Sequence, residues 1–482
     1  MKIRFILAAL ILLFACKKHN SGNGGNASTT PTYYKDIVIN ETVGSSGAAP
    51  WQHAVGYFQL QSDPATQIMV ASRGTQELND ANGFRIASIN KANGAINWVK
   101  SYDLPDQYYI QLVTCAAIDN NDNIWVGGHS FDGTGTAGIL FLAKLDKSGN
   151  MLWSGSLSNY QGWRAYSLAV LSSGDIAFFA KGFAGLAVLR LTASQQLVWS
   201  TIISSENIDD DFYRNNNTTL SPENHAMVET ADGSIYVATS SNPASYEQPS
   251  ADKLYQLNGS GTLQFAKIYT QAFPGTTRPV QLINAGPNNL LMADQFVENG
   301  YTTATPFFNL LGLDGTLQAS RGYPLTASFG GPEINEVNFY QGSIYFSTCG
   351  NSAFDTYILD LNLNLKSAVE TVADTLATTD RGGISLFDST QNALYYVCNF
   401  GDVNPNPSNG FEVLQTRANG QSCDTTYSGN AIPLLLNNTS ITVTPDTVAM
   451  NHVSSGPAPV FTSLTWQSST VTVGATNTIC GQ

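Results

Sequence analysis

Seven polar residues recur at a nearly constant distance before a turn signal, and three of them are arginines. Arginine side chains hold carboxylate and phosphate groups through paired hydrogen bonds. If the innermost strands of a ring carry these residues, the seven side chains surround the mouth of a central channel. They then either bind a ligand or pair with one another and close the channel. The seven residues are His53, Gln111, Arg164, Glu223, Arg278, Glu333 and Arg381.

The long connecting segments are rich in aromatic residues, which offer flat amphipathic surfaces to a sugar or a peptide. Alternatively, these rings fill gaps between packed sheets. Long loops on a rigid scaffold commonly carry binding sites. We therefore expect a ligand to contact four of these aromatic residues, namely Tyr109, Tyr160, Trp163 and Tyr213.

Residues suited to catalysis or metal binding are sparse. The chain has only five histidines, and it has no Gly-x-Ser-x-Gly elbow, phosphate-binding loop or His-Glu-x-x-His motif. Residues 119–123 alternate oxygen donors as a calcium loop does, but the glycine and terminal acid of that loop are missing, which favours an ordinary turn. The acidic run 209–211 is a better candidate for a surface ion, although a solvated run of charges is the default interpretation. We predict no catalytic residue, no metal site and no cofactor.

A repeat extends through most of the chain. Strand-like runs such as Phe84–Ile89 and Ala95–Val99 flank a turn at Gly94, and similar units follow with a mean spacing of about 54 residues. A second hairpin lies between successive units. Four short strands repeated seven times predict an all-β fold, a seven-bladed β-propeller of four-stranded antiparallel blades. The repeated turns are centred on Gly94, Gly149, Gln195, Gly261, Gly315, Asn364 and Gly420.

The propeller is expected over residues 33–430, and residues 431–482 fall outside the repeat as a short β-rich C-terminal tail. This tail either supplies a closing strand to the last blade or packs against the ring as an appendage. Val38 and Ile39, near the other end of the chain, are also able to close the ring. The sequence leaves these possibilities open.

Two hairpins, Ile89–Trp98 and Leu145–Trp153, resemble the blade motif of PQQ-like propellers, in which a strand turns at glycine and resumes toward tryptophan. The resemblance covers about residues 55–427 and weakens along the chain. It supports the propeller fold. Quinone enzymes of that family need an Asp base and a calcium site, often beside adjacent cysteines, and this chain has no Cys-Cys pair. The resemblance therefore favours the non-enzymatic members.

The first residues read as an export signal, with two basic residues followed by the apolar run Phe5–Phe14. Leu13-Phe14-Ala15-Cys16 resembles a bacterial lipobox, which implies cleavage after residue 15 and lipidation of Cys16; a plain cleaved signal is the alternative. Residues 16–32 then form a lipidated cysteine and flexible tether. The resemblance implies an outer-membrane lipoprotein anchored through its lipid, and the basic residues 17–19 slightly favour the periplasmic side over the cell surface.

The charge and the cysteine content limit the classes of partner and the covalent links that we expect. A formal charge of -14 makes nucleic acid an unsuitable partner. Five cysteines remain beside Cys16, and Cys423 and Cys480 are the preferred disulfide because they flank the tail. The leading hypothesis is a non-catalytic protein that binds a glycan, peptide or protein through its long loops. A polysaccharide-active hydrolase or lyase is the alternative, and a PQQ-type oxidoreductase ranks third.

Overall fold

The structure is a computed structural model that describes residues of the propeller and of the C-terminal tail. The chain separates into residues Met1–Thr30 and Pro31–Gln482, and every described residue belongs to the second part. None of the described residues forms a helix long and apolar enough to cross a bilayer. The described residues are 32–40, 51–74, 83–103, 110–131, 138–157, 160, 163–182, 185–203, 226–241, 249–298, 304–323, 333–350, 353–372, 383–401, 409–418, 443–447, 453–455 and 461–480.

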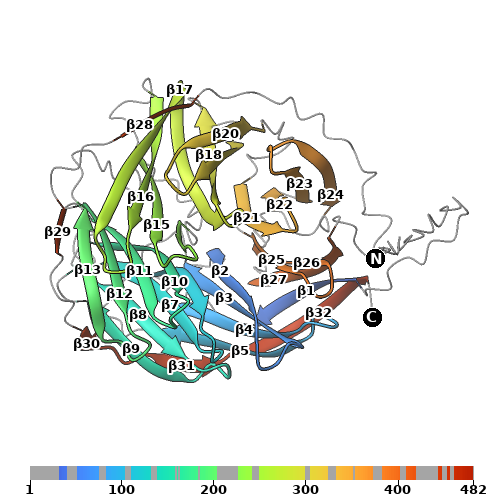
Figure 1. The fold of residues 1–482 in the computed structure, drawn as a ribbon. Coiled ribbons are helices and arrows are strands. Elements are labelled where there is room, and N and C mark those ends of the chain that lie inside the picture. The colour runs from blue at the N-terminus through green and yellow to red at the C-terminus, as the bar shows by residue number, and fades with distance from the viewer. Residues whose placement is uncertain are drawn as a thin grey trace, which may run out of the picture. The chain divides into compact units, whose positions relative to one another are not determined.

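Seven four-stranded antiparallel blades form a ring, so the predicted propeller is confirmed (Figure 1). From the innermost strand outward, blade 1 consists of β2 (Trp51–Gln59), β3 (Thr66–Gly74), β4 (Phe84–Asn90) and β5 (Ile96–Asp103). Blade 2 consists of β6 (Ile110–Ile118), β7 (Ile124–Phe131), β8 (Leu140–Leu145) and β9 (Met151–Leu157). Blade 3 consists of β10 (Arg164–Val170), β11 (Ile176–Gly182), β12 (Gly185–Leu191) and β13 (Leu197–Ile203).

Blades 4 and 5 share one continuous strand, which ends the first and begins the second. Blade 4 consists of β14 (Met227–Glu229), β15 (Ile235–Ser241), β16 (Pro249–Leu257) and the first part of β17 (Leu263–Asn284). Blade 5 consists of the second part of β17 with β18 (Asn289–Glu298), β19 (Ala304–Gly312) and β20 (Leu317–Gly322). Blade 6 consists of β21 (Glu333–Tyr340), β22 (Ser343–Gly350), β23 (Ala353–Asp360) and β24 (Leu365–Val372).

The two ends of the chain meet in blade 7, where β1 (Tyr33–Asn40) is the fourth strand. The other strands of this blade are β25 (Gly383–Asp388), β26 (Ala393–Gly401) and β27 (Asn409–Arg417). Val38 and Ile39 pair with Gly410 and Asn409, so the N-terminal strand closes the ring. Blade 7 therefore joins β1, which leads along the chain into β2 of blade 1, to three strands from the other end of the propeller sequence.

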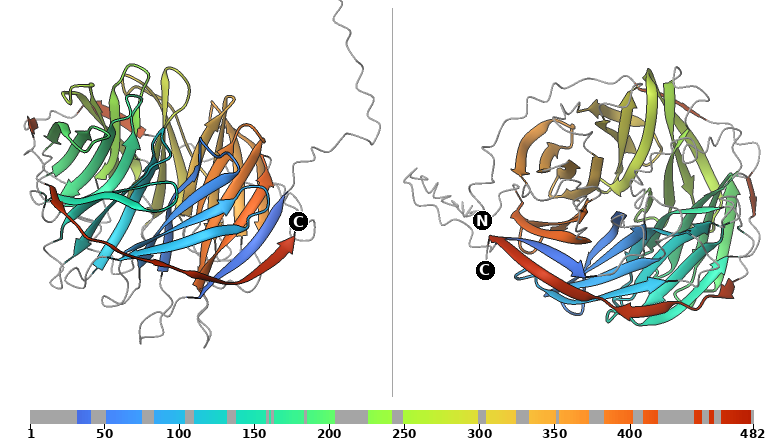
Figure 2. Two further views of the ribbon diagram at one scale, coloured as in Figure 1. Left: turned by 90° about the horizontal axis from the view of Figure 1, so that it is seen from below. Right: turned by 180° about the vertical axis from the view of Figure 1, so that it is seen from behind.

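The C-terminal tail adds a fifth, outermost strand to five of the blades. It passes from blade 4 through blades 3, 2 and 1 to blade 7, against the order of the chain, along the outside of the ring (Figure 2). The tail is thus an outer edge layer, and its last strand lies outside β1. These strands are β28 (Val443–Thr447), β29 (Val453–Ser455), β30 (Phe461–Ser463), β31 (Gln467–Thr470) and β32 (Thr472–Cys480).

Asx turns explain the tight hairpins. The Asp146 side chain accepts hydrogen bonds from the backbone N–H groups of Ser148 and Asn150, at 2.9 and 2.8 Å, and Gly149 between them has a φ of 74°. The Asn258 side chain does the same in blade 4. A short polar side chain that caps its own turn makes such hairpins self-contained. Each blade therefore has a tight-turn end and, opposite it, a long-connection end.

The core is divided among the seams between neighbouring blades. One apolar cluster fills the seam of blades 1 and 2, another that of blades 2 and 3, and others lie farther around the ring and at its closure. Phenolic and hydroxyl groups join the seams at the tight-turn end: the Tyr269 hydroxyl donates to the Gly315 carbonyl at 2.7 Å, and the Thr201 hydroxyl to the Gly261 carbonyl at 2.6 Å. Each blade is thus both packed and hydrogen-bonded to the next.

Candidate functional site

The predicted channel positions are placed by a β-bulge in the innermost strands. The register shifts just after His53, Arg164, Arg278 and Glu333, so these four residues occupy equivalent places in their blades. In blade 2 the bulge lies between Val113 and Cys115, which makes Leu112 the equivalent residue and puts Gln111 one residue out of register. A shift of one residue turns a side chain to the other face of a strand. The position of the bulge that causes this shift is not visible in the sequence.

The structure describes the side chains of two of the seven channel residues, and both are buried. Gln111 is 0% exposed and Arg164 is 6% exposed. The structure gives backbone pairing, without side-chain surroundings, for His53, Arg278 and Glu333. Glu223 and Arg381 lie outside the described residues, as do the loop aromatics Tyr109 and Tyr213.

A group of basic side chains lies at the long-connection end of blades 3 and 4. Arg164 is paired across the strands with Lys181. Lys253, on β16, is 8% exposed, and its pKa is lowered first by burial and then by the charge of Lys181. We call Arg164, Lys181 and Lys253 the basic corner. Sequence reasoning selected Arg164 and missed the two lysines, because neither belongs to the repeated position.

Aromatic and histidine side chains line the same region. The Lys181 ammonium group lies 4.6 Å from the centre of the Tyr166 ring, a cation–π contact. His129, at the long-connection end of β7, is 2% exposed, and burial, with the Arg164 charge in addition, lowers its pKa to about 3. The imidazole is therefore neutral at physiological pH, and a pKa so far from neutrality makes it a poor acid–base catalyst.

Two of the predicted loop aromatics belong to the core. Tyr160 is 0% exposed and Trp163 is 8% exposed, and their rings meet edge to face with centroids 5.4 Å apart. Trp163 also covers Gly182, where an added Cβ atom would lie 2.5 Å from the indole ring. Both rings fill the seam of blades 2 and 3, as the gap-filling alternative expects, so in this position neither offers an open surface to a ligand.

A polar pair links the inner strands of blades 5 and 6. Glu336 directly follows a bulge, and its side chain accepts a hydrogen bond of 2.7 Å from the Gln281 amide. The Gln281 oxygen accepts in turn from the Val337 backbone N–H at 2.6 Å. Burial raises the pKa of Glu336 to about 8, so this acid is mostly protonated at pH 7.

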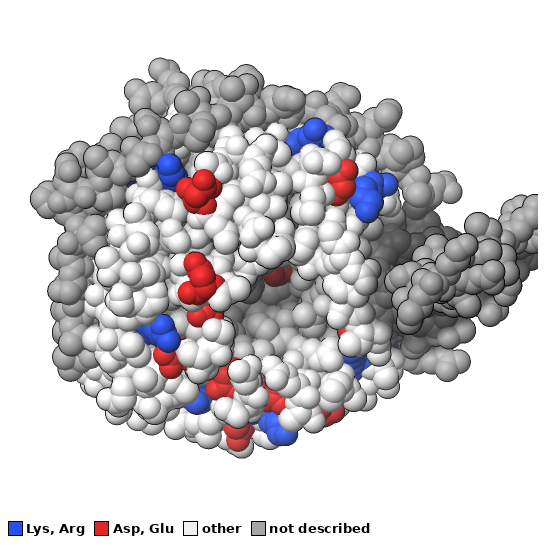
Figure 3. Space-filling model, in the orientation of Figure 1, with Lys and Arg blue, Asp and Glu red and all other residues white. Residues whose placement is uncertain are grey.

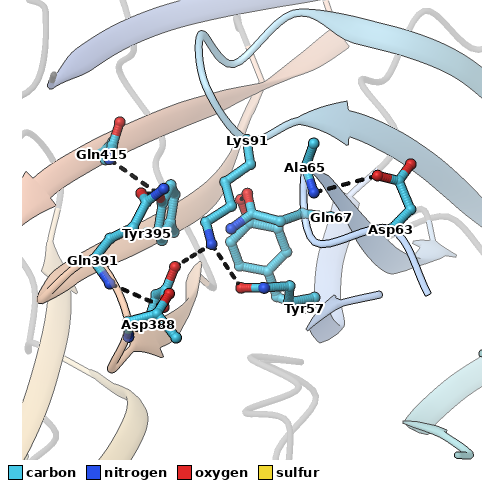
Figure 4. A network of polar contacts seen from close by, with 11 residues as sticks. Tyr57, Asp63, Ala65, Gln67, Lys91, Asp388, Gln391, Tyr395 and Gln415 are labelled. Atoms are coloured by element: carbon cyan, nitrogen blue, oxygen red, sulfur yellow. Dashed lines mark hydrogen bonds and ion pairs between the residues drawn. The ribbon is translucent and has the colours of Figure 1, made fainter. Parts of the chain in front are cut away.

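A network of polar side chains lies at the closure of the ring, between blades 7 and 1 (Figure 4). Lys91 forms a buried ion pair with Asp388 and donates a hydrogen bond of 2.9 Å to Gln59. The Tyr395 hydroxyl donates to Gln391 at 2.6 Å and accepts from Gln415 at 3.0 Å. Each charge has an opposite charge or a hydrogen-bonding partner, so the network is suited to hold two blades together.

Residues 119–123 form an inter-blade link. The Asp119 side chain caps its own turn, accepting from the backbone N–H groups of Asn121 and Asn123, both at 2.9 Å. The Asp122 carboxylate accepts from two successive N–H groups of blade 1, Gln61 at 2.7 Å and Ser62 at 2.8 Å. The backbone thus provides the partners that a cation would otherwise supply, which agrees with the turn interpretation.

The ring has a central hollow on the face seen in Figure 3, with acidic side chains beside it and uncharged residues over most of the described part of this face. Over the described ranges, no group of three or more His, Cys, Asp or Glu residues could hold a metal ion. Cys115 is a buried free thiol, and burial raises its pKa to about 12. Cys16 and Cys423 lie outside the described residues, so the proposed lipidation and the Cys423–Cys480 disulfide remain predictions.

Comparison with known proteins gives likenesses of fold. No family model matches the chain, and no curated protein matches it. A protein of unknown function from Bacteroides caccae is 12% identical, with 70% of this chain and 94% of that one covered and a TM-score of 0.37. A protein from Lactobacillus plantarum is 9% identical, with 78% and 94% covered and a TM-score of 0.42. The propeller domain of the Trilobed protease from Pyrococcus furiosus is 9% identical, with 80% and 98% covered and a TM-score of 0.40. The propeller assignment itself rests on the strand pairing.

Proposed function

We propose that this chain is a non-catalytic lipoprotein of the cell envelope whose propeller binds a glycan, peptide or protein at its long-connection end. The observation that carries the proposal is the basic corner, which gathers Arg164, Lys181 and Lys253 in a protein with a formal charge of -14. A ring of packed blades is a rigid support for such a site.

The chemistry of the corner favours an acidic group on the partner. Positive charges held in a poorly solvated region act more strongly on a nearby anion than charges in open water. Arginine adds the paired hydrogen bonds that fit a carboxylate or a phosphate. The partner is therefore expected to carry such a group, as acidic polysaccharides and acidic peptides do.

Binding is tested with an array of acidic and neutral glycans and the full-length protein. Arg164→Met should lower the affinity for the acidic ligands about tenfold, the loss of one charge-assisted contact. Lys100→Met is the matched control, because Lys100 lies at the tight-turn end and donates to the Ser148 carbonyl. Near-UV circular dichroism verifies that both variants fold. Equal binding by the two variants would contradict the proposal, and turnover of a bound polysaccharide would support the enzymatic alternative.

Attachment to the membrane is a separate part of the proposal. It rests on the lipobox-like residues 13–16, and residues 17–19 favour the periplasmic face of the outer membrane. Cys16→Ser should move the protein from the membrane fraction to the soluble fraction of the envelope. Retention of this variant in the membrane fraction would show that the lipid is not the anchor.

A further inference from the structure

Two acids and an amide meet in the seam between blades 4 and 5, away from the basic corner. Asp252 lies on β16 of blade 4, while Asp294 and Asn309 lie on the neighbouring strands β18 and β19 of blade 5. All three are 0% exposed. Along β16 the side chains alternate, so Asp252 faces away from Lys253 and toward blade 5.

The carboxyl groups are in direct contact. The Asn309 amide nitrogen donates a hydrogen bond of 3.3 Å to Asp294, and the Asp294 and Asp252 side chains are hydrogen-bonded to each other. Burial, and then the Asp252 charge, raise the pKa of Asp294 well above its ordinary value. Asp252 also contributes to the raised pKa of Tyr269, after burial and Asp314. Two carboxylates with the same charge adjoin only if something positive lies between them, either a shared proton or a cation.

Unsatisfied oxygens favour the cation. Oδ1 of Asn309 and Oδ1 of Asp294 are buried, and neither has a hydrogen-bond partner among the described residues. Oγ of Ser320 is also buried and also has no hydrogen-bond partner among the described residues. Ser320 is the cross-strand neighbour of Asn309. A proton shared by the two acids leaves the amide oxygen without a partner, at a cost of about 1–3 kcal/mol. A metal ion would satisfy the amide and both acids together.

We propose that Asp252, Asp294 and Asn309 form a binding site for a divalent cation between blades 4 and 5. The donors are all oxygens, two from carboxylates and one from an amide, which is the ligand set of calcium and magnesium rather than of zinc or copper. The site then joins the two blades and neutralises their buried acids.

Thermal unfolding of the full-length protein tests the site. The protein is unfolded in EDTA and refolded at pH 8 with either EDTA or 1 mM calcium or magnesium, so that burial does not prevent entry of the ion. Calcium or magnesium should raise the Tm by at least about 2 °C.

Two variants make the test specific. Asp294→Asn should fold, since an amide resembles the protonated acid, and should lose the metal-dependent shift. Asp360→Asn is the matched control, because Asp360 caps an exposed turn in blade 6, and it should keep the shift. Absence of a shift with both ions in the unmodified protein, or an equal shift in Asp294→Asn, would overturn the proposal.

Discussion

The seam that closes the ring and the seam of blades 4 and 5 surround their buried acidic side chains with opposite kinds of neighbour. Both bury acidic side chains between two blades. At the closure, Asp388 faces the ammonium group of Lys91, and glutamine and tyrosine side chains surround the pair. Between blades 4 and 5, Asp294 faces another acid, Asp252. The closure seam therefore balances its own charge, whereas the other seam holds an excess of negative charge.

The difference follows the path of the chain. Blades 4 and 5 are covalently continuous through β17, a single strand of 22 residues. Blades 7 and 1 share no such strand: β1 leads along the chain into β2 of blade 1, but β25, β26 and β27 are held at this seam by the pairing of β1 with β27 and by side chains. Strands β25, β26 and β27 are held against blade 1 by noncovalent contacts, and these contacts must be strong and specific. A seam that the backbone already holds can tolerate an unfavourable acid pair and use it to bind an ion.

The largest effect is expected from breaking the balanced seam. Asp388→Asn keeps an acceptor for the turn N–H of Thr390, at 2.8 Å in the native protein, but leaves the ammonium group of Lys91, whose side chain is 5% exposed, without its anion. Removal of one partner of a buried ion pair costs about 3–5 kcal/mol. Urea unfolding should show this loss at pH 7. A double variant, Lys91→Met with Asp388→Asn, should recover part of it, and a single variant as stable as the native protein would refute the balanced-seam interpretation.

An Asp→Asn substitution in the seam of blades 4 and 5 should change the free energy of unfolding in the opposite direction. Asp294→Asn in EDTA at pH 8 removes a carboxyl group that is costly to ionise, and should stabilise the protein by about 1–3 kcal/mol. Because the pKa of Asp294 is raised in the folded protein, its contribution to stability is greatest below its ordinary pKa of 3.8 and is lost as the pH rises toward the folded value. Burial alone would raise the pKa of Asp388, but hydrogen bonds from Lys91 and Thr390 lower it, so its contribution is lost as the pH falls below 3.8.

Unfolding curves in EDTA between pH 3 and pH 9 separate these two contributions. The native protein should lose stability at both ends of the range. Asp294→Asn should flatten the alkaline side, and Asp388→Asn should flatten the acid side. An alkaline side that Asp294→Asn leaves unchanged would show that another group controls it.

The repeat was readable in the sequence because each hairpin closes on itself. Asp146 and Gly149 make one turn, Asn258 and Gly261 make another, and their spacing gives the blades without knowledge of any long-range contact. The path of the tail was not readable. Its strands β29 and β30 are three residues each, and their partners lie about 250 to 300 residues away in the chain. Strands that short have no pattern of their own, because the blade edge determines where they pair.

The site was predictable only in part. Arg164 was found because it occupies a repeated position, but Lys181 and Lys253 join it through blade packing that no spacing reveals. The bulge in β6 displaced Gln111 from the expected register. The acid pair of Asp252 and Asp294 was not predicted. Two acids in separate strands can be recognised as neighbours only when it is known which face of each strand they occupy.

A glycine substitution tests how closely the closure seam is packed. Gly94 has a φ of 68°, and an added Cβ atom would lie 2.5 Å from the ring of Tyr33 on the closing strand. Gly174 has a φ of 83° with no atom within 4 Å of an added Cβ, so it controls for the backbone strain alone. Both alanine variants should lose about 1 kcal/mol from the positive φ. Gly94→Ala should lose about 1–2 kcal/mol more, because β1 must shift. Equal losses in urea unfolding would mean that Tyr33 moves freely.

The smallest expected effect compares one hydroxyl group from each seam. At the closure, the Tyr395 hydroxyl both donates to Gln391 and accepts from Gln415, a 1% exposed side chain. Between blades 4 and 5, the Tyr236 hydroxyl donates to the Leu313 carbonyl at 2.7 Å. Tyr395→Phe leaves a buried amide without its acceptor and should cost about 1–2 kcal/mol, whereas Tyr236→Phe removes one bond to a partly buried carbonyl and should cost about 0.5–1 kcal/mol. If urea unfolding gave the larger loss to Tyr236→Phe, side-chain hydrogen bonds would matter more in the continuous seam than in the closing one. The contrast between the two seams would then rest on their charges alone.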